Sequence, residues 1–202
     1  SCFGVEGIVV MIPTACAAGN YAIGYAYDLI RKGTMDIMLA GGAEAFSRVP
    51  VCGFNRLFSI DPEACRPFDR NRKGIIPSEG ASVLILETAE SARQRGAPIY
   101  AEVRGYGLAC SAYQMTKPEP DGDSGYRAIR AALSNAGIPD QSIGYISAHG
   151  TGTPANDIAE TIAIKKAFGR GAYQIPVSSI KSMIGHSFGA ASAIEAATCP
   201  MI

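Results

Sequence analysis

The sequence predicts an α/β protein in which helices cover a mostly parallel sheet, and three observations lead to this class. Short apolar runs alternate with helical patterns along the whole chain of 202 residues, as they do in proteins built from βα units. A glycine directly follows four of the helical patterns, where a left-handed residue commonly ends a helix. The hydrophobic fraction of 48% and the charged fraction of 18% indicate a chain that buries a sizeable core without disulfides or a structural metal.

The expected elements follow from these patterns in chain order. We expect strands at residues 7–12, 36–40, 81–87, 99–110, 143–148 and 175–179. We expect helices at residues 17–32, 89–95, 124–136, 156–168 and 187–198, and the glycines that follow four of them are Gly33, Gly96, Gly137 and Gly169. Residues 50–77 and 116–125 are predicted to form long irregular loops, and loops of this length in a compact domain are often functional.

Charge and composition exclude several classes of function. Eighteen basic residues balance eighteen acidic ones, and there is no basic run, which argues against a nucleic-acid or anionic-membrane partner. No apolar run reaches the ~18 residues that a membrane span needs. The six cysteines, at positions 2, 16, 52, 65, 110 and 199, have no regular spacing. This scatter argues against a disulfide framework and indicates a reducing, cytoplasmic compartment.

The ends of the sequence indicate an internal piece of a longer chain. The first residue is Ser1, and the sequence stops within an alanine-rich helical pattern after residue 196. An organellar targeting segment would therefore lie outside these residues.

Cys16 is the first candidate for a reactive residue. It follows the expected strand 7–12, opens the expected helix 17–32 and has small neighbours on both sides. A thiol at a helix N-terminus faces free backbone N–H groups, which favour the thiolate and nucleophilic attack. A buried structural cysteine is the equally weighted alternative, because free cysteines are among the most buried residues.

The only two histidines of the chain, His149 and His186, are the next candidates. His149 follows the expected strand 143–148 and enters a loop of glycine and threonine, and His186 follows a glycine beyond the expected strand 175–179. Both therefore lie near the carboxyl ends of strands, where open α/β sheets collect their ligands.

Four motifs occur along the chain: TACAAG at residues 14–19, PFD at 67–69 with the stretch 72–80, HGTGT with ND at 149–157, and Lys181 with GHSFGA at 185–190. Together they resemble the β-ketoacyl-[acyl-carrier-protein] synthases, and most of all the elongating type II enzymes. The resemblance covers nearly all of the chain, and four motifs in the same order are highly specific.

The resemblance implies a thiolase-like five-layer αβαβα fold, of which this chain would be an internal fragment. Residues 1–97 would be the end of the N-terminal half and residues 98–202 most of the C-terminal half. Such proteins form homodimers or ketosynthase-like heterodimers, and they act with an acyl carrier protein. The implied reaction is decarboxylative condensation of an acyl group with malonyl-acyl carrier protein in fatty-acid or polyketide elongation.

The resemblance also assigns roles to residues. Cys16 would carry the acyl group, and His149, His186 and Lys181 would complete the catalytic set. Glu160 and Asp157 would be supporting polar residues, and a last pair, Thr151 and Thr153, would contact the phosphopantetheine arm. A thiolate can take an acyl group from a thioester, and imidazole N–H groups can stabilise an enolate. We therefore expect no metal and no enzyme-bound cofactor.

Some positions depart from the family pattern. Ser111 and Gln114 stand where Asp and His are frequent, Ile75 where an aromatic residue is common, and Ser192 where glycine is common. The glycine-rich C-terminal gate of the family has no counterpart in these residues, so we expect the active site of this piece to be incomplete.

Three other interpretations stay open at this stage. A non-catalytic partner subunit would shape the chain-length tunnel and bind the carrier protein, but such partners typically lose the nucleophile that Cys16 provides. A zinc site of Cys16, His149 and His186 uses suitable residue types but lacks the short spacing of zinc motifs. A thiolase would need a second catalytic cysteine, and Cys199 lies in no matching motif.

Overall fold

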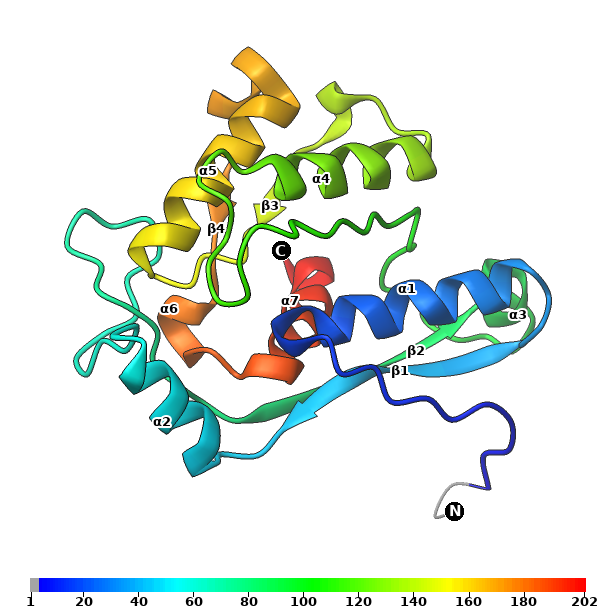
Figure 1. The fold of residues 1–202 in the computed structure, drawn as a ribbon. Helices are drawn as coiled ribbons and strands as arrows, with labels where there is room; N and C mark the ends of the chain where they lie inside the picture. The colour runs from blue at the N-terminus through cyan, green and yellow to red at the C-terminus, as the bar shows by residue number, and fades with distance from the viewer. Residues whose placement is uncertain (1–3) are drawn as a thin grey trace.

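A computed structural model describes residues 4–202, so Cys2 lies outside the described residues. The chain forms two connected parts, one around a long pair of strands and one around a pair of packed helices (Figure 1). Residues 14–19 and 185–190, which carry two of the sequence motifs, come together on the first part. Among residues 4–202, no helix is long and apolar enough to cross a bilayer.

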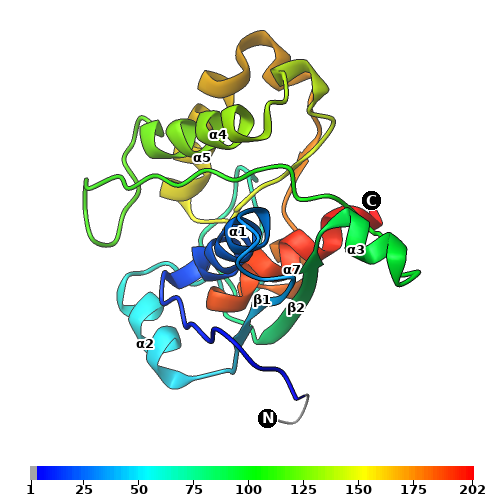
Figure 2. The ribbon, with the colours of Figure 1, turned by 90° about the vertical axis from the view of Figure 1, so that its right-hand side faces the viewer.

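The first part is a two-stranded antiparallel sheet with two helices on one face. Strand β1 (Ile37–Glu44) pairs with β2 (Gly80–Glu87) from end to end. Helices α1 (Ala18–Arg31) and α7 (Ala191–Thr198) lie side by side on this sheet (Figure 2). Ile23, Ala26 and Ala40 form the buried core between them. The opposite face of the sheet is exposed at four large apolar side chains, Ile37, Leu39, Val83 and Ile85.

The second part joins two helices and a short parallel sheet. Helix α4 (Asp123–Ala136) packs on α5 (Pro154–Phe168), and β3 (Ile146–Ser147) pairs in parallel with β4 (Val177–Ser178). The remaining α-helices are α2 (Arg48–Arg56), α3 (Ala89–Gln94) and α6 (Lys181–Ile184). Short 3-10 helices occupy Ala15–Ala17, Asp140–Ser142, Gly169–Tyr173, Phe188–Ala190 and Cys199–Met201.

Helix ends follow local sequence chemistry where a polar cap is available. The side chains of Ser47, Thr88 and Thr153 accept backbone N–H groups at the starts of α2, α3 and α5, as N-cap residues do. Gly33, Gly96, Gly137 and Gly169 all have the expected positive φ. The last of the four is not a left-handed cap, because its ψ is −127°.

Two expected strands are wrong. Residues 7–12 pair with no other strand and residues 7–11 are exposed, with Val9 95% and Met11 87% accessible. Residues 99–110 are also not a strand; instead, their glycines Gly105 and Gly107 lie close against α4. A β-branched, apolar run becomes a strand only when another strand satisfies its backbone groups, and the described residues offer neither run such a partner.

Other expectations need adjustment. The larger sheet is antiparallel rather than parallel, and the expected strands 143–148 and 175–179 shrink to two residues each. Helix α2 occupies the start of the stretch that we expected to be irregular, residues 50–77. The helices expected at 17–32, 89–95, 124–136 and 156–168 are confirmed within a few residues, and the one expected at 187–198 begins as a 3-10 turn.

The close packing of α1 on α7 predicts a large effect of a small substitution. A Cβ at Gly19 would lie 2.4 Å from the backbone nitrogen of Ala193, so Gly19→Ala should lower the free energy of unfolding by about 2 kcal/mol or more. The matched control is Gly53→Ala in α2, where nothing lies within 4 Å of the added Cβ; it should stabilise the helix by about 0.5 kcal/mol. Urea unfolding of the whole protein measures both. Equal stability of the two variants would contradict this packing.

Candidate active site

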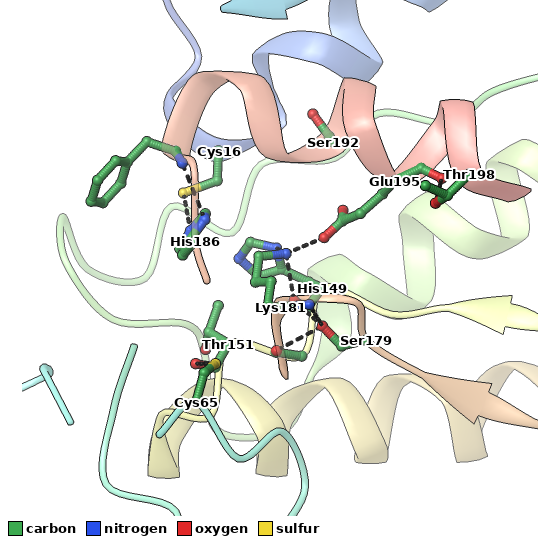
Figure 3. A network of polar contacts seen from close by, with 12 residues as sticks. Cys16, Cys65, His149, Thr151, Ser179, Lys181, His186, Ser192, Glu195 and Thr198 are labelled. Atoms are coloured by element: carbon green, nitrogen blue, oxygen red, sulfur yellow. Dashed lines mark hydrogen bonds and ion pairs between the residues drawn. The ribbon is translucent and has the colours of Figure 1, made fainter. Parts of the chain in front are cut away.

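Cys16 lies in the 3-10 turn Ala15–Ala17 that leads into α1. The turn is strained, because Ala15 has a φ of +51°, a region that costs a residue with a side chain of order 1 kcal/mol. The turn directs the thiol toward the segment before α7, and Cys16 Sγ lies 3.0 Å from His186 Nε2 (Figure 3). The geometry therefore joins two residues that are 170 positions apart in the sequence.

His186 is fixed by its own backbone and by its neighbours. Its N–H donates to the carbonyl of Ile76 (2.7 Å) and its carbonyl accepts from Ser78 N–H (3.0 Å). The backbone N–H of Phe188 donates to His186 Nδ1 (3.2 Å), and the Phe188 ring stacks on the imidazole at 5.1 Å. Because Nδ1 accepts this hydrogen bond, a neutral ring carries its proton on Nε2, the atom that faces Cys16.

His149 enters the site from the loop after β3. A carboxylate fixes this loop: Glu160 accepts the backbone N–H groups of His149 (2.6 Å) and Gly150 (2.8 Å). The expected supporting role of Glu160 thus concerns the backbone of His149 rather than its imidazole. Gly150 has a φ of +39°, and a Cβ there would lie 2.5 Å from the Ser179 side chain, so only glycine fits at this turn.

Lys181 connects helix α7 with the loop that carries His149. Its side chain is 1% exposed and forms a buried ion pair with Glu195 of α7. It also donates to the carbonyl of His149 (2.7 Å) and lies 3.4 Å from His149 Nδ1 (Figure 3). Since an ammonium group has only donors, Nδ1 of His149 is the acceptor and Nε2 carries the proton. Both histidines therefore present an Nε2–H.

Asp157 lies outside the thiol and imidazole cluster. Its carboxylate accepts the backbone N–H groups of Phe68 (2.7 Å) and Gly152 (3.2 Å) and pairs with Arg72 at 3.5 Å. These contacts tie the stretch around residue 68 to the loop that carries Thr151. Asp157 therefore joins two segments at the edge of the site and lies away from the thiol and the imidazoles, and its supporting role stays a prediction.

One cavity of about 320 Å³ brings five of the predicted residues together: Cys16, His149, Thr151, Thr153 and His186. The hydroxyls of the two threonines lie 2.9 Å apart. Both long loops expected to be functional contribute to the wall, through Phe54, Leu57, Ser59 and Ile75 and through Thr116, Lys117 and Pro118. The cavity thus combines a thiol and two imidazoles with hydroxyl-bearing and apolar side chains.

Burial and the Lys181 charge set the ionisation of the two imidazoles. Burial, and then the charge of Lys181, lower the pKa of His186 to about 3. The same two causes, with a smaller contribution from His186, hold the pKa of His149 well below its usual value. Both rings are therefore neutral hydrogen-bond donors near neutral pH.

The acidic and thiol groups of the site respond to burial in the opposite direction. Burial raises the pKa of Glu160 and of Glu195, against their hydrogen bonds to backbone N–H groups and to Lys181 respectively. Burial also raises the pKa of the Cys16 thiol, although Lys181 opposes this. The helix N-terminus was expected to favour the Cys16 thiolate, but desolvation is the larger effect in the free protein, so the shift of the Cys16 pKa runs in the opposite direction.

The three candidate zinc ligands lie close together, but the protonation of the two imidazoles does not suit a metal. One ligand atom each from Cys16, His149 and His186 lies within 4.8 Å of the others. The hydrogen bonds from Phe188 and Lys181 leave protons on both Nε2 atoms, and a protonated nitrogen has no lone pair for a metal. The arrangement suits hydrogen-bond donation to a substrate oxygen better than metal coordination.

Two contributors were missed by the sequence analysis. Glu195 is the only charged residue in the alanine-rich stretch 187–198, and a lone buried charge of this kind must be paired. That signal could have indicated its role. The backbone N–H of Phe188, which fixes the His186 ring, leaves no signal in side-chain chemistry.

Two family models together match nearly the whole chain. The β-ketoacyl synthase N-terminal domain matches residues 1–92, and the β-ketoacyl synthase C-terminal domain matches residues 100–202. The chain belongs to the β-ketoacyl synthase family. This confirms the resemblance drawn from the four motifs, whereas the boundary expected near residue 98 stays a prediction.

Curated members of the family cover nearly the whole chain. The 3-oxoacyl-[acyl-carrier-protein] synthase 2 of Staphylococcus aureus is 46% identical over 199 residues, which are 96% of this chain and 49% of that protein. The protein of the same name from Synechocystis is 48% identical over 205 residues, 98% of this chain and 49% of that protein. The chain thus spans about half the length of the β-ketoacyl synthases it matches.

Solved ketosynthases confirm the thiolase-like fold class. The ishigamide ketosynthase/chain length factor has a TM-score of 0.89 and 48% identity, and covers 94% of this chain and 46% of its own. A type II PKS acyl-carrier protein in complex with its ketosynthase bound to the hexaketide gives a TM-score of 0.91 and 44% identity over 94% of this chain and 48% of that one. The ketosynthase ApeO in complex with its chain length factor ApeC, from Xenorhabdus doucetiae, gives a TM-score of 0.83 and 39% identity. The match covers 92% of this chain and 44% of that one.

Because His186 is buried in its neutral form, the stability of the folded chain should depend on pH. The unfolded chain binds a proton near the ordinary pKa of about 6.5, whereas the folded pKa is about 3. Between these values the unfolded state binds more protons, so the free energy of unfolding falls as the pH falls, by up to about 1.4 kcal/mol per pH unit. His186→Gln should remove the contribution of His186 to this fall in the free energy of unfolding.

Urea unfolding between pH 7 and pH 5 measures the difference. The wild type should lose about 2 kcal/mol more than His186→Gln over this range. Parallel curves for the two proteins would show that His186 is not buried in its neutral form.

Proposed function

We propose that the whole protein is a β-ketoacyl-[acyl-carrier-protein] synthase that elongates an acyl chain by decarboxylative condensation. The observation that carries this proposal is the cluster of Cys16 Sγ and the ring nitrogens of His149 and His186, within 4.8 Å, on one cavity. The names of the curated relatives, 3-oxoacyl-[acyl-carrier-protein] synthase 2, support it.

In the first step, Cys16 takes the acyl group from an acyl thioester. The Cys16 Sγ–carbonyl bond forms, the carbonyl–sulfur bond of the donor thioester breaks, and the thiol proton passes to the departing carrier thiolate. The Nε2–H of His186 lies 3.0 Å from Cys16 Sγ, so it is positioned to donate a hydrogen bond to the sulfur while the thiol loses its proton. The raised pKa of Cys16 makes this proton transfer a necessary part of the step.

In the second step, malonyl thioester loses CO2 beside the acylated Cys16. The bond between the malonyl carboxylate and its methylene carbon breaks, and its electron pair forms an enolate. The Nε2–H groups of His149 and His186 donate to the enolate oxygen, which stabilises the developing charge. The nucleophilic carbon then attacks the acyl carbonyl, the carbon–sulfur bond to Cys16 breaks, and the thiol is regenerated by taking up a proton.

The remaining residues hold this arrangement. Thr151 and Thr153 line the cavity and suit the amide groups of a phosphopantetheine arm. Lys181 orients His149, and its charge adds to the burial that keeps both imidazoles neutral. No step of the proposed chemistry requires a metal or an enzyme-bound cofactor.

The partners of the protein belong to the same proposal. We expect an acyl carrier protein as substrate carrier, and either a homodimer or a heterodimer with a ketosynthase-like subunit. The neighbours described as ketosynthases with a chain length factor or an acyl-carrier protein support both kinds of partner. A purely non-catalytic subunit is the second candidate, and the thiol and both donors in one cavity favour the enzyme.

Separation of the two half-reactions tests the assignment. Cys16→Gln should abolish condensation while CO2 release from malonyl-acyl carrier protein persists, because the thiol has no role in decarboxylation. His149→Ala or His186→Ala should slow CO2 release by roughly 10²- to 10³-fold, the usual cost of one lost oxyanion donor. Cys52→Ala, which alters an exposed thiol, is the matched control and should leave both half-reactions unchanged.

The measurement is CO2 release and product formation by the whole protein. If Cys16→Gln abolishes CO2 release as completely as the histidine variants do, the proposed division of roles is wrong. If neither the wild type nor any variant releases CO2, the protein is the non-catalytic partner subunit instead.

A further inference from the structure

The N-terminus of α1, which positions Cys16, has no cap from its own sequence. Neither Thr14 before the 3-10 turn nor Ala17 before α1 makes a side-chain cap hydrogen bond. The Thr14 hydroxyl is buried without a hydrogen-bond partner. The carbonyls of Thr14 and Ala15 accept the N–H groups of Ala17 and Ala18, and the following N–H groups of the first turn need acceptors from outside the helix's own ladder.

A residue of the facing helix supplies one. Ser192 of α7 accepts the backbone N–H of Asn20 through its Oγ, at 3.1 Å. Asn20 is the third residue of α1, the position whose N–H an ordinary N-cap serine or threonine would accept. Ser192 is only 5% exposed, so water cannot easily replace its hydroxyl.

The packing brings the two helices close enough for this contact. A Cβ on Gly19 would lie 2.9 Å from Ser192 Oγ and 2.4 Å from the Ala193 nitrogen. The absence of a side chain at Gly19 thus lets α7 reach the first turn of α1. Figure 3 shows Ser192 and Glu195 on the same helix, with Glu195 directed to Lys181 and Ser192 directed away from it.

We propose that Ser192 is a positioning residue for Cys16: its hydroxyl caps α1 from α7 and holds the strained turn that aims the thiol at His186. The residue touches neither substrate nor the reacting atoms. The claim that Cys16 takes an acyl group rests on the proposed function, whereas the capping of α1 does not. The strain at Ala15 is the reason such a restraint matters, because an unfavourable φ persists only where the surroundings enforce it.

Loss of the hydroxyl should change the reactivity of Cys16 in a defined direction. Without its acceptor, the first turn of α1 frays, and its N–H groups no longer favour the thiolate. The charged and titratable groups that face Cys16 are His186 and His149, Lys181 of α6, Glu195 of α7 and Glu44 of β1. Substitution of Ser192 alters none of them, so a change can be assigned to the cap.

The test measures the alkylation rate of Cys16 against pH in the whole protein, with iodoacetamide as probe and peptide mapping to identify the thiol. Ser192→Ala should move this profile to higher pH and slow alkylation at pH 7.5 by about three- to tenfold, since a cap is worth about 1 kcal/mol. Acyl loading should lose kcat by a similar factor with little change in KM. Ser192→Thr keeps the hydroxyl and should restore both.

The matched control is Ser147→Ala, which removes a buried hydroxyl that has no hydrogen-bond partner. It should leave the Cys16 profile at its wild-type position. If Ser192→Ala does not fold, Ser192→Cys keeps nearly the same shape with a weaker acceptor, and it should move the profile in the same direction.

The outcomes separate the two proposals. A Cys16 profile that is unchanged or moves to lower pH overturns the positioning role of Ser192, whatever happens to the melting temperature. A wild-type protein whose Cys16 is alkylated but never acylated overturns the proposed function, and the alkylation profiles still decide whether Ser192 acts on Cys16.

Discussion

The ammonium group of Lys181 lies in a part of the protein that is almost closed to water, and the arrangement of the site depends on how that charge is satisfied. An unpaired charge in such a position costs several kcal/mol. Glu195 of α7 neutralises this charge, and the carbonyl and Nδ1 of His149 accept the other hydrogen bonds of the ammonium group. This requirement joins α6, α7 and the loop after β3, and it leaves His149 in a single tautomer.

Burial, and then the same charge, explain why the two imidazoles are neutral rather than protonated. Burial alone lowers the pKa of a histidine, and a nearby cation lowers it further. Lys181 contributes to the lowered pKa of both His149 and His186, so their Nε2–H groups stay neutral at the cavity. Phe188 fixes the ring of His186 from the backbone, as Lys181 fixes that of His149. The proposed enolate oxygen would therefore meet two donors whose orientation is set before substrate arrives.

The sequence predicted most of the helices within a few residues and singled out three side chains that the structure brings together, because both depend on local patterns. Cys16, His149 and His186 stand out at turns between periodic stretches, and the structure brings them to one cavity. That residues 7–12 and 99–110 form no strand was not predictable in the same way, since a strand exists only where a distant partner pairs with it.

Three features of the site also depend on tertiary packing rather than on local sequence patterns. The pairing of Lys181 with Glu195 needs α6 and α7 to pack around a common polar centre. The raised pKa of Cys16 comes from burial by segments that lie far away in the chain, and a helix N-terminus visible in the sequence gives no measure of it. The capping of α1 by Ser192 likewise spans 172 residues.

The tautomers of His149 and His186 test the central claim most directly. Nitrogen-15 NMR of histidine-labelled protein at pH 7, with His149→Gln and His186→Gln used to assign the signals, distinguishes a protonated from an unprotonated ring nitrogen. The account predicts two neutral rings, each with its proton on Nε2 and with Nδ1 as an acceptor. A proton on Nδ1 of either ring, or an imidazolium at this pH, would contradict it.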